Sequence, residues 1–313
     1  MTIANNPTAV LLMGPTAAGK TDLAVELTSR WPFELISVDS ALVYRGMDIG
    51  TGKPSAAVLR QYPHHLVDIL DPTESYSAGR FVREVTTLIA DIHHRGRIPL
   101  LVGGTMLYFR ALLRGIAEMP VAAPQLRAEI EQRAMELGWP ALHAELAARD
   151  PRVARKIGIN DAQRIQRALE VMALTGRLMS DVQGDATPPL PNVQFLKLGL
   201  SPANREVLYT RIEQRFQQML QQGFLAEVAC LYQRGDLHAA LPSMRAVGYR
   251  QLWQHLAGEC SLETAITQGI FATRHLARRQ LIWMRAEPGL TWLDTEADNL
   301  MNQIESQIRP IFG

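Results

Sequence analysis

The stretch that decides the fold reads Val10-Leu11-Leu12-Met13-Gly14-Pro15-Thr16-Ala17-Ala18-Gly19-Lys20-Thr21, followed by DLAVELTSR. A short apolar run ends at a glycine, and Gly14 to Thr21 match the pattern G-x-x-x-x-G-K-[ST]. A strand before such a loop and a helix after it let the loop N–H groups and the helix N-terminus face an anion. The stretch therefore predicts a polyphosphate site at the carboxyl end of a strand.

Each residue type in this loop has a physical task. Gly14 and Gly19 let the backbone curl around the anion, Lys20 brings an ammonium to the terminal phosphate oxygens, and the Thr21 hydroxyl can ligate Mg²⁺. We call the set the cradle; its members are Gly14, Pro15, Thr16, Ala17, Ala18, Gly19, Lys20 and Thr21. The cradle alone leaves open a kinase, an NTPase or an enzyme for which diphosphate is a leaving group.

A second glycine-lysine stretch, Gly50-Thr51-Gly52-Lys53, is followed by Pro54. Because no helix N-terminus is offered in the same way, we do not expect it to be a second cradle.

Outward from the cradle, apolar runs alternate with helical stretches. This alternation predicts an α/β fold with a parallel sheet, helices on both faces as in P-loop proteins, and functional loops at the carboxyl ends of the strands. The expected strands are Val10–Met13, Leu35–Val38, Leu66–Leu70 and Ile98–Val102, and the expected helices are Thr21–Arg30 and Ala78–His94.

Between about residues 120 and 179 the strand signal disappears, and three helical stretches cover Gln125–Leu137, Pro140–Arg149 and Ala162–Leu174. We expect an all-helical insertion domain. Beyond the proline-rich joint 188–191 the pattern predicts a strand at Phe195–Leu200, helices at Asn204–Gln222, Phe224–Gln233 and Leu262–Arg285, and an edge strand at Leu290–Leu293. The expected organisation is 1–119 for the first part of the core, 120–190 for the insertion and 191–313 for the second part.

Composition narrows the class of protein. The chain has 313 residues, of which 47% are hydrophobic and 20% charged, as in a folded enzyme and unlike a disordered chain. No apolar run approaches the ~20 residues that a membrane helix requires, and Cys230 and Cys260 lack zinc-ligand spacing. We expect a cytoplasmic monomer. The net charge of +1 means that any nucleic-acid footprint is local.

Asp39 ends the second apolar run, which places it at the same sheet edge as the cradle. A carboxylate there can be an outer-shell magnesium ligand, a helix N-cap or a base that takes a proton from a nucleophile. Its position leaves these three roles open.

The chain resembles the bacterial tRNA dimethylallyltransferases over nearly its whole length. The motifs that carry the resemblance occur in family order: GPTAAGKT, ELISVDSALVYRGMDIGTGKP, PHHLVDILDP, IPLLVGGTMLYFRALL, NDAQRIQRALEV and PSMRAVGYRQLW. Ala18 and Gly52 stand where the family often has Ser and Ala. The resemblance implies transfer of a dimethylallyl group from dimethylallyl diphosphate to N6 of adenine 37, next to the anticodon of tRNA, with release of diphosphate.

The resemblance also implies roles for single residues. The cradle clamps the leaving diphosphate with Lys20 and with Mg²⁺ held by Thr21, and Arg215 helps to hold the same group. Asp39 takes the proton from the adenine amine. Thr105, after the Gly103-Gly104 doublet, contacts the target nucleotide, although it could equally be a helix N-cap.

An adenine stacked in the anticodon loop must be splayed out to react, so the contacts with the tRNA anticodon stem-loop are expected around the pocket. The expected tRNA-binding residues are Asp39, Ser40, Ala41, Leu42, Thr105, Arg127, Gln163, Arg164, Ile165, Gln166, Arg167, Arg245, Ala246, Val247, Gly248, Tyr249, Arg250, Arg274, Arg278 and Arg279. Tyr249 is expected to be available for stacking. For Arg164 and Arg167 the alternative is a solvated helix face paired with Asp161 and Glu170.

Three other functions stay open. An isopentenyltransferase acting on free AMP, ADP or ATP would share the cradle and Asp39 but has little use for the insertion. A P-loop small-molecule kinase would turn over ATP. An RNA-binding module with an inert cradle would not need Gly19, Lys20, Thr21 and Asp39 intact.

Overall fold

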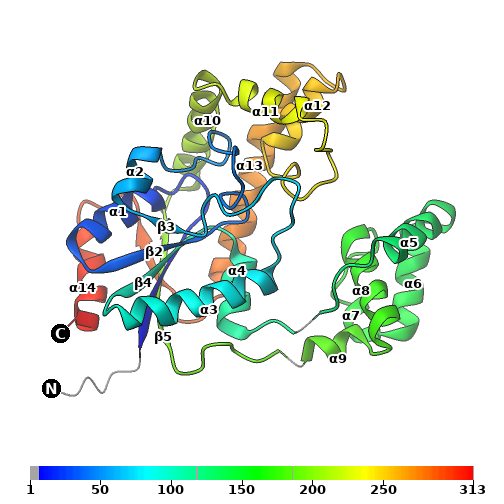
Figure 1. Ribbon diagram of the computed structural model, residues 1–313, viewed down its shortest axis with the longest axis horizontal. Helices are drawn as coiled ribbons and strands as arrows, with labels where there is room; N and C mark the ends of the chain where they lie inside the picture. The colour runs from blue at the N-terminus through cyan, green and yellow to red at the C-terminus, as the bar shows by residue number, and fades with distance from the viewer. Residues whose placement is uncertain (1–6, 118, 185, 313) are drawn as a thin grey trace. The chain divides into compact units, whose positions relative to one another are not determined.

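The computed structural model describes residues 7–117, 119–184 and 186–312, and they fall into two compact units (Figure 1). Unit 1 comprises 1–109 and 190–313, and unit 2, which we call the helical unit, comprises 110–189. Helix α4 (Met106–Arg114) carries the chain from the first to the second. No helix among the described residues is long and apolar enough to span a membrane.

Unit 1 is built on a six-stranded sheet of order β3-β2-β4-β1-β5-β6 in which every neighbouring pair is parallel. The strands are β1 (Thr8–Met13), β2 (Phe33–Val38), β3 (His64–His65), β4 (Ile98–Gly103), β5 (Gln194–Ser201) and β6 (Thr291–Asp294). In the register Gly103 of β4 lies opposite both Met13 and Val38. The residues that follow β1, β2 and β4, which include the cradle, Asp39 and Thr105, therefore leave the sheet at one edge.

Helices cover both faces of this sheet, as predicted. Alternate strand residues such as Val10 and Leu12 face a core that also contains residues of α1 (Lys20–Arg30) and α14 (Leu300–Phe312). Helix α3 (Ala78–His94) contacts β4 and buries an apolar stripe that includes Phe81 and Ile89. The short helix α2 (Ala56–Gln61) begins at a Ser55 cap.

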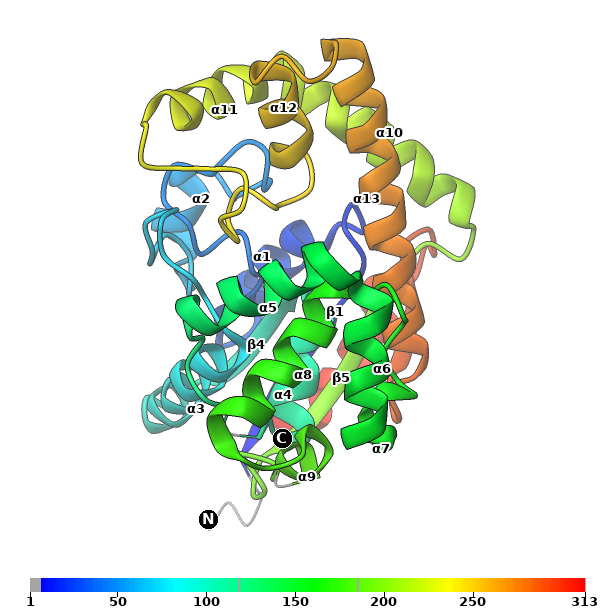
Figure 2. The same cartoon turned by 90° about the vertical axis from the view of Figure 1, so that its right-hand side faces the viewer.

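A second core in unit 1 lies among the helices that follow β5. These helices are α10 (Arg205–Gln221), α11 (Phe224–Gln233), α12 (Tyr249–Leu256) and α13 (Leu262–Arg285). Phe216, Phe224 and Tyr249 pack there against Val43 and Met47 from the loop after β2. Helix α13 runs alongside α10, as Figure 2 shows, so the long basic helix is anchored to the unit that carries the cradle.

The helical unit has a core of its own. It contains α5 (Pro124–Leu137), α6 (Trp139–Arg149), α7 (Pro151–Ala154), α8 (Ala162–Thr175) and α9 (Met179–Gly184). Leu142, Leu146, Ile165 and Val171 are among its fully buried side chains. Strand patterning is absent from its sequence, and no strand occurs among its described residues.

The prediction of a strand at Leu66–Leu70 is wrong. The third strand consists of His64–His65, and Leu66 and Asp68 have φ angles of 65° and 56°. Left-handed backbone interrupts an extended strand, and the segment instead bonds to the loop after β2, with the Ile69 N–H donating to the Val43 carbonyl at 2.9 Å.

Candidate active site

The cradle follows β1 and curls back to the start of α1. Ala17 and Gly19 have φ angles of 63° and 76°, and the Ala18 N–H donates to the Pro15 carbonyl at 3.3 Å. The Gly14 N–H donates to the Gly103 carbonyl at 3.3 Å, which ties the first residue of the cradle to β4. The loop thus leaves the N-terminus of α1 open toward an anion.

The surroundings of Lys20 in the cradle disfavour its positive charge. Its ammonium donates to the Pro15 carbonyl at 2.7 Å. Burial and the neighbouring guanidinium of Arg215 lower the pKa of Lys20 to about 8, while the Asp39 carboxylate opposes the shift. A polyanion in the cradle would stabilise this ammonium.

Arg215 reaches the site from α10. Burial lowers the pKa of its guanidinium, and the carboxylates of Asp39 and Asp22 act in the opposite direction. A Cβ added to Gly52, whose φ is +66°, would collide with this guanidinium, so the glycine lets the arginine lie against the loop 48–53. Arg215 and Lys20 therefore form a pair of half-buried cations near one carboxylate.

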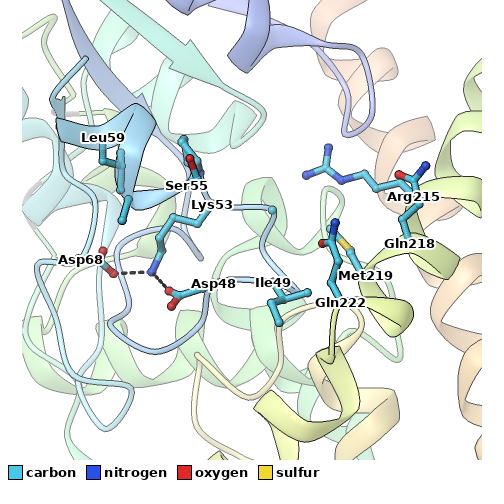
Figure 3. Close-up of a pocket in the computed structure, with 13 residues that line it drawn as sticks. Asp48, Ile49, Lys53, Ser55, Leu59, Asp68, Arg215, Gln218, Met219 and Gln222 are labelled. Carbon is cyan, nitrogen blue, oxygen red and sulfur yellow. Dashed lines mark hydrogen bonds and ion pairs between the residues drawn. The ribbon is translucent and has the colours of Figure 1, made fainter. Parts of the chain in front are cut away.

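A cavity of about 470 Å³ lies between the loop 48–56 and α10 (Figure 3). Of the residues predicted for the site, all of which are described, Arg215 is the one that lines it. Lys53 lines it too, and in Figure 3 its ammonium points to Asp48 and Asp68, with both of which it forms ion pairs. Because its charge is satisfied by these acids, Lys53 is not the lysine of a second cradle, which agrees with the interpretation of the Gly50–Lys53 stretch.

Glu227 on α11 fixes this loop. Its carboxylate accepts the N–H groups of Asp48, Ile49 and Gly50 at 2.9, 2.7 and 3.1 Å, and it accepts the Tyr249 hydroxyl as well. Three of these four donors belong to the loop 48–53, so this one carboxylate holds the segment against which Arg215 lies.

Asp39 and Thr105 lie at the same edge of the sheet, where Thr105 bonds to Ser40, the residue that follows Asp39. One carboxylate oxygen of Asp39, Oδ1, accepts the N–H groups of Ala41 and Leu42 at 2.8 and 3.3 Å, and Oδ2 has no hydrogen-bond donor among the described residues. Thr105 Oγ1 accepts the Ser40 N–H at 3.1 Å. The backbone therefore orients Asp39 while leaving one oxygen available to accept a proton.

The predicted RNA contacts of unit 1 divide by exposure. Arg245, Arg250, Arg278 and Arg279 are exposed, whereas Arg274 donates to Glu213 at 2.7 Å and lies over the Tyr209 ring. Arg278 and Arg279 have no acidic partner within the described parts of the chain.

Tyr249 corrects one expectation. Its ring is fully buried against Phe224 and its hydroxyl is bonded to Glu227, so it is not available to stack on a base. Gly248 beside it is buried as well, while Ala246 and Val247 are half-buried.

The helical unit gathers the remaining predicted contacts. Gln163 and Arg164 are exposed, and Arg164 lies 3.5 Å from Asp161. Ile165 is completely buried in the core of the unit, so its inclusion among the RNA contacts is corrected. The helix period explains this, because Ile165 lies on the buried stripe of α8 with Ala168, Leu169 and Met172, three, four and seven residues further on.

Arg127 and Arg167 enclose a buried carboxylate. Arg127 Nε and Nη2 donate to Glu170 at 2.8 and 3.0 Å, Arg167 donates to the same group, and the Ala123 N–H adds a bond at 2.8 Å. Burial raises the pKa of Glu170, but the bonds from Arg127 and Arg167 outweigh it and lower the pKa to about 2. The alternative pairing considered for Arg167 is thus present, and Gln166 donates to Glu131 and to the Arg127 carbonyl.

Two residues of the site were missed from the sequence, Glu227 and Gln280. Gln280 on α13 accepts the Thr16 N–H at 3.0 Å and donates to the Gly104 carbonyl at 2.8 Å. Its only sequence signal is an uncharged polar residue between Arg279 and Leu281 in a helix whose buried stripe includes Ala277 and Met284.

The donor set suits Mg²⁺ bound together with phosphate oxygens rather than a metal held by protein alone. No group of three or more His, Cys, Asp or Glu side chains that could hold a metal occurs among the described residues. The Thr21 hydroxyl stands at the start of α1 with no hydrogen-bond partner in the described part of the chain. One protein oxygen plus substrate oxygens is a common way to bind this ion.

Known proteins match this chain over nearly all of it. The family model described as IPP transferase matches residues 42–287, and a second, isopentenyl transferase, matches 7–68. A tRNA dimethylallyltransferase of Methylococcus capsulatus is 54% identical over 310 residues, which is 99% of each chain.

Solved structures of tRNA-modifying transferases are similar to this chain as well. The tRNA isopentenylpyrophosphate transferase of Bacillus halodurans is 38% identical with a TM-score of 0.70 and 97% of each chain covered. A eukaryotic dimethylallyltransferase acting on tRNA is 26% identical with a TM-score of 0.78, covering 97% of this chain and 77% of that one. Because the family model matches residues 42–287 and a relative that is 54% identical covers 99% of the chain, the chain belongs to the IPP transferase family.

Proposed function

We propose that this protein transfers the dimethylallyl group of dimethylallyl diphosphate to N6 of adenine 37 in tRNA, next to the anticodon, and releases diphosphate. The observation that carries the proposal is the placement of two half-buried cations, Lys20 and Arg215, near the Asp39 carboxylate, with Lys20 at the N-terminus of α1 behind the glycine loop. Two neighbouring like charges that are partly removed from water are unfavourable alone and favourable around a polyanion. Similarity to enzymes named for tRNA supports the choice of acceptor.

The cradle holds the diphosphate of the donor. As the allylic C–O bond breaks, negative charge accumulates on the leaving oxygens, and the loop N–H groups, Lys20 and Arg215 would stabilise that charge. A Mg²⁺ ion ligated by Thr21 and by phosphate oxygens would supply further charge stabilisation. The bond that breaks is the allylic C–O bond, and its electron pair stays with diphosphate.

Asp39 prepares the acceptor. The lone pair of the adenine amine is delocalised into the ring, so the amine gains nucleophilicity as its proton leaves. Oδ1 is fixed by the Ala41 and Leu42 N–H groups, which leaves Oδ2 to accept the N6 proton while the C–N bond forms. Thr105, bonded to Ser40, would contact the same nucleotide.

The RNA contacts are proposed on the exposed basic residues. In unit 1 these are Arg245, Arg250, Arg278 and Arg279, and in the helical unit Gln163 and Arg164. We assign the helical unit to tRNA binding, with Arg127 and Arg167 chiefly holding Glu170.

The test offers labelled dimethylallyl diphosphate with Mg²⁺ to three acceptors: an anticodon stem-loop with adenine at position 37, the same stem-loop with guanine there, and free AMP. The proposal expects label in the first acceptor alone. Label in AMP alone would favour an adenylate isopentenyltransferase. A fourth reaction contains ATP as well, and phosphate release from that ATP without any labelled product would favour a kinase or NTPase.

A further inference from the structure

The side chain of Gln280 connects two parts of the site that are far apart in the sequence, the cradle and the end of β4. It lies on α13, yet its side-chain Oε1 accepts the N–H of Thr16 in the cradle at 3.0 Å, and its Nε2 donates to the carbonyl of Gly104 at 2.8 Å. Its exposed fraction is 8%, so water does not compete freely for either bond. All three residues belong to unit 1.

The two bonds define the orientation of the amide. The Thr16 N–H can only donate and the Gly104 carbonyl can only accept, so one side-chain atom must accept and the other must donate. Glutamine meets this need, whereas an ionised carboxylate has no proton for the carbonyl.

Gly104 makes the approach possible. A Cβ on Gly104 would collide with the Nε2 of Gln280 and would lie 3.2 Å from the Gly14 carbonyl. Thr105 follows directly and bonds to Ser40, the neighbour of Asp39. A single side chain thus connects the cradle with the strand end that carries the acceptor-side residues.

We propose that Gln280 is a positioning residue for the transfer reaction: by bridging Thr16 and Gly104 it holds the diphosphate cradle at a fixed separation from Thr105 and Asp39. The inference rests on the proposed function. Misplacement by about 1 Å of groups that must meet in a transition state costs up to about a hundredfold in rate. Because Gln280 adjoins Arg278 and Arg279 on the same helix, the bridge also joins the exposed basic face of α13 to the cradle.

The experiment compares Gln280→Glu with Gln280→Met. A protonated glutamic acid can accept from Thr16 and donate to Gly104 as the amide does, whereas the ionised form sets an oxygen against the Gly104 carbonyl. Methionine has similar length and makes neither bond. The exposed residue Gln268 on the same helix supplies the matched control, Gln268→Glu, which makes the same charge change without a buried bond.

The measurement is single-turnover transfer to a saturating stem-loop at pH 6.0 and pH 7.5, expressed relative to the wild type at each pH. Ratios are needed because Lys20, the titratable group of the cradle, affects every variant. Gln280→Met should be slower by about tenfold at both values, as for two lost buried hydrogen bonds. The relative rate of Gln280→Glu should be at least about threefold higher at pH 6.0 than at pH 7.5, and Gln268→Glu should match the wild type at both.

Binding of inorganic diphosphate with Mg²⁺, measured by calorimetry on the same proteins, keeps the two proposals separable. Absence of transfer by the wild type would reject the proposed function, and the bridge would then be judged from diphosphate binding by Gln280→Glu, expected to be tighter relative to the wild type at pH 6.0 than at pH 7.5. If folded Gln280→Met transfers at the wild-type rate, or if Gln280→Glu shows no pH-dependent ratio, the positioning role is wrong. Circular dichroism at both pH values verifies that each variant is folded.

Discussion

The protonation of Lys20 should control how well this site binds dimethylallyl diphosphate. The ammonium is destabilised by burial and by Arg215, so that the pKa of Lys20 lies at about 8 before any anion binds. Only the protonated form pairs with diphosphate. The affinity for dimethylallyl diphosphate should therefore fall as the pH rises through the pKa of Lys20, and binding of the donor above that pH should be accompanied by uptake of a proton.

The size of the effect comes from the same pKa. A group with a pKa of about 8 is about 90% protonated at pH 7 and about 10% protonated at pH 9. The value of kcat/KM for the donor should therefore fall about tenfold between these pH values, because kcat/KM reports the protonation state of the protein before the donor binds.

The assay measures kcat/KM for dimethylallyl diphosphate with saturating stem-loop, at intervals from pH 7 to pH 9. Lys20→Arg is the matched variant, since a guanidinium stays protonated throughout this range. It is expected to be slower overall but to lose at most about twofold across the range, and the ratio of the two profiles removes titration of the RNA.

Two results would refute this reasoning. A flat wild-type profile would mean that the charge of Lys20 does not contribute to donor binding or is not held near its titration point. An equal decline in Lys20→Arg would place the titrating group elsewhere.

Three further predictions use other parts of the chain. Asp39→Asn should lower kcat by about 10² to 10⁴ with unchanged affinity for the stem-loop in a filter-binding assay, as expected for a lost general base; loss of RNA affinity at a normal kcat would reject that role. Arg278→Ala should weaken stem-loop binding and reduce the slope of log K against log salt by about 1, whereas Arg309→Ala, exposed on α14, should change neither. Because the pKa of Glu170 is lowered in the folded state, the stability that its carboxylate contributes should be lost as the pH falls from about 4.5 toward about 2. In chemical denaturation near pH 7, Glu170→Gln should lower the free energy of unfolding by on the order of 3 kcal/mol, and the half-exposed control Glu145→Gln should lower it by less than about 1 kcal/mol. Equal losses in the two variants would contradict this role of Glu170.

Local pattern was a good guide where one short stretch determines its own structure. Helices α3, α11 and α13 begin and end where the periodicity predicts, and five of the strands lie within two residues of their expected ends. The run Leu66–Leu70 misled because its apolar composition carries no information about the positive φ angles of Leu66 and Asp68. Those angles depend on bonds to the loop after β2, over twenty residues earlier.

The sequence also predicted the residues of the cradle, but it did not reveal Glu227 and Gln280, which hold the surrounding loops in place. Nothing beside Tyr249 in the sequence shows that Glu227 binds its hydroxyl and Phe224 covers its ring, so an exposed aromatic was expected where the structure has a buried one. Gln280 illustrates the same limit, because its partners Thr16 and Gly104 lie more than 170 residues away in the chain. Long-range contacts of this kind require the fold.

The central claim is tested most directly by a crystal structure of the protein with a stem-loop, Mg²⁺ and a thio analogue of dimethylallyl diphosphate that resists cleavage. The account predicts diphosphate oxygens within hydrogen-bond distance of the Lys20 ammonium and the Asp39 carboxylate about 3 Å from N6 of an extruded adenine. A diphosphate bound away from the cradle, or an adenine amine beyond reach of Asp39, would contradict it.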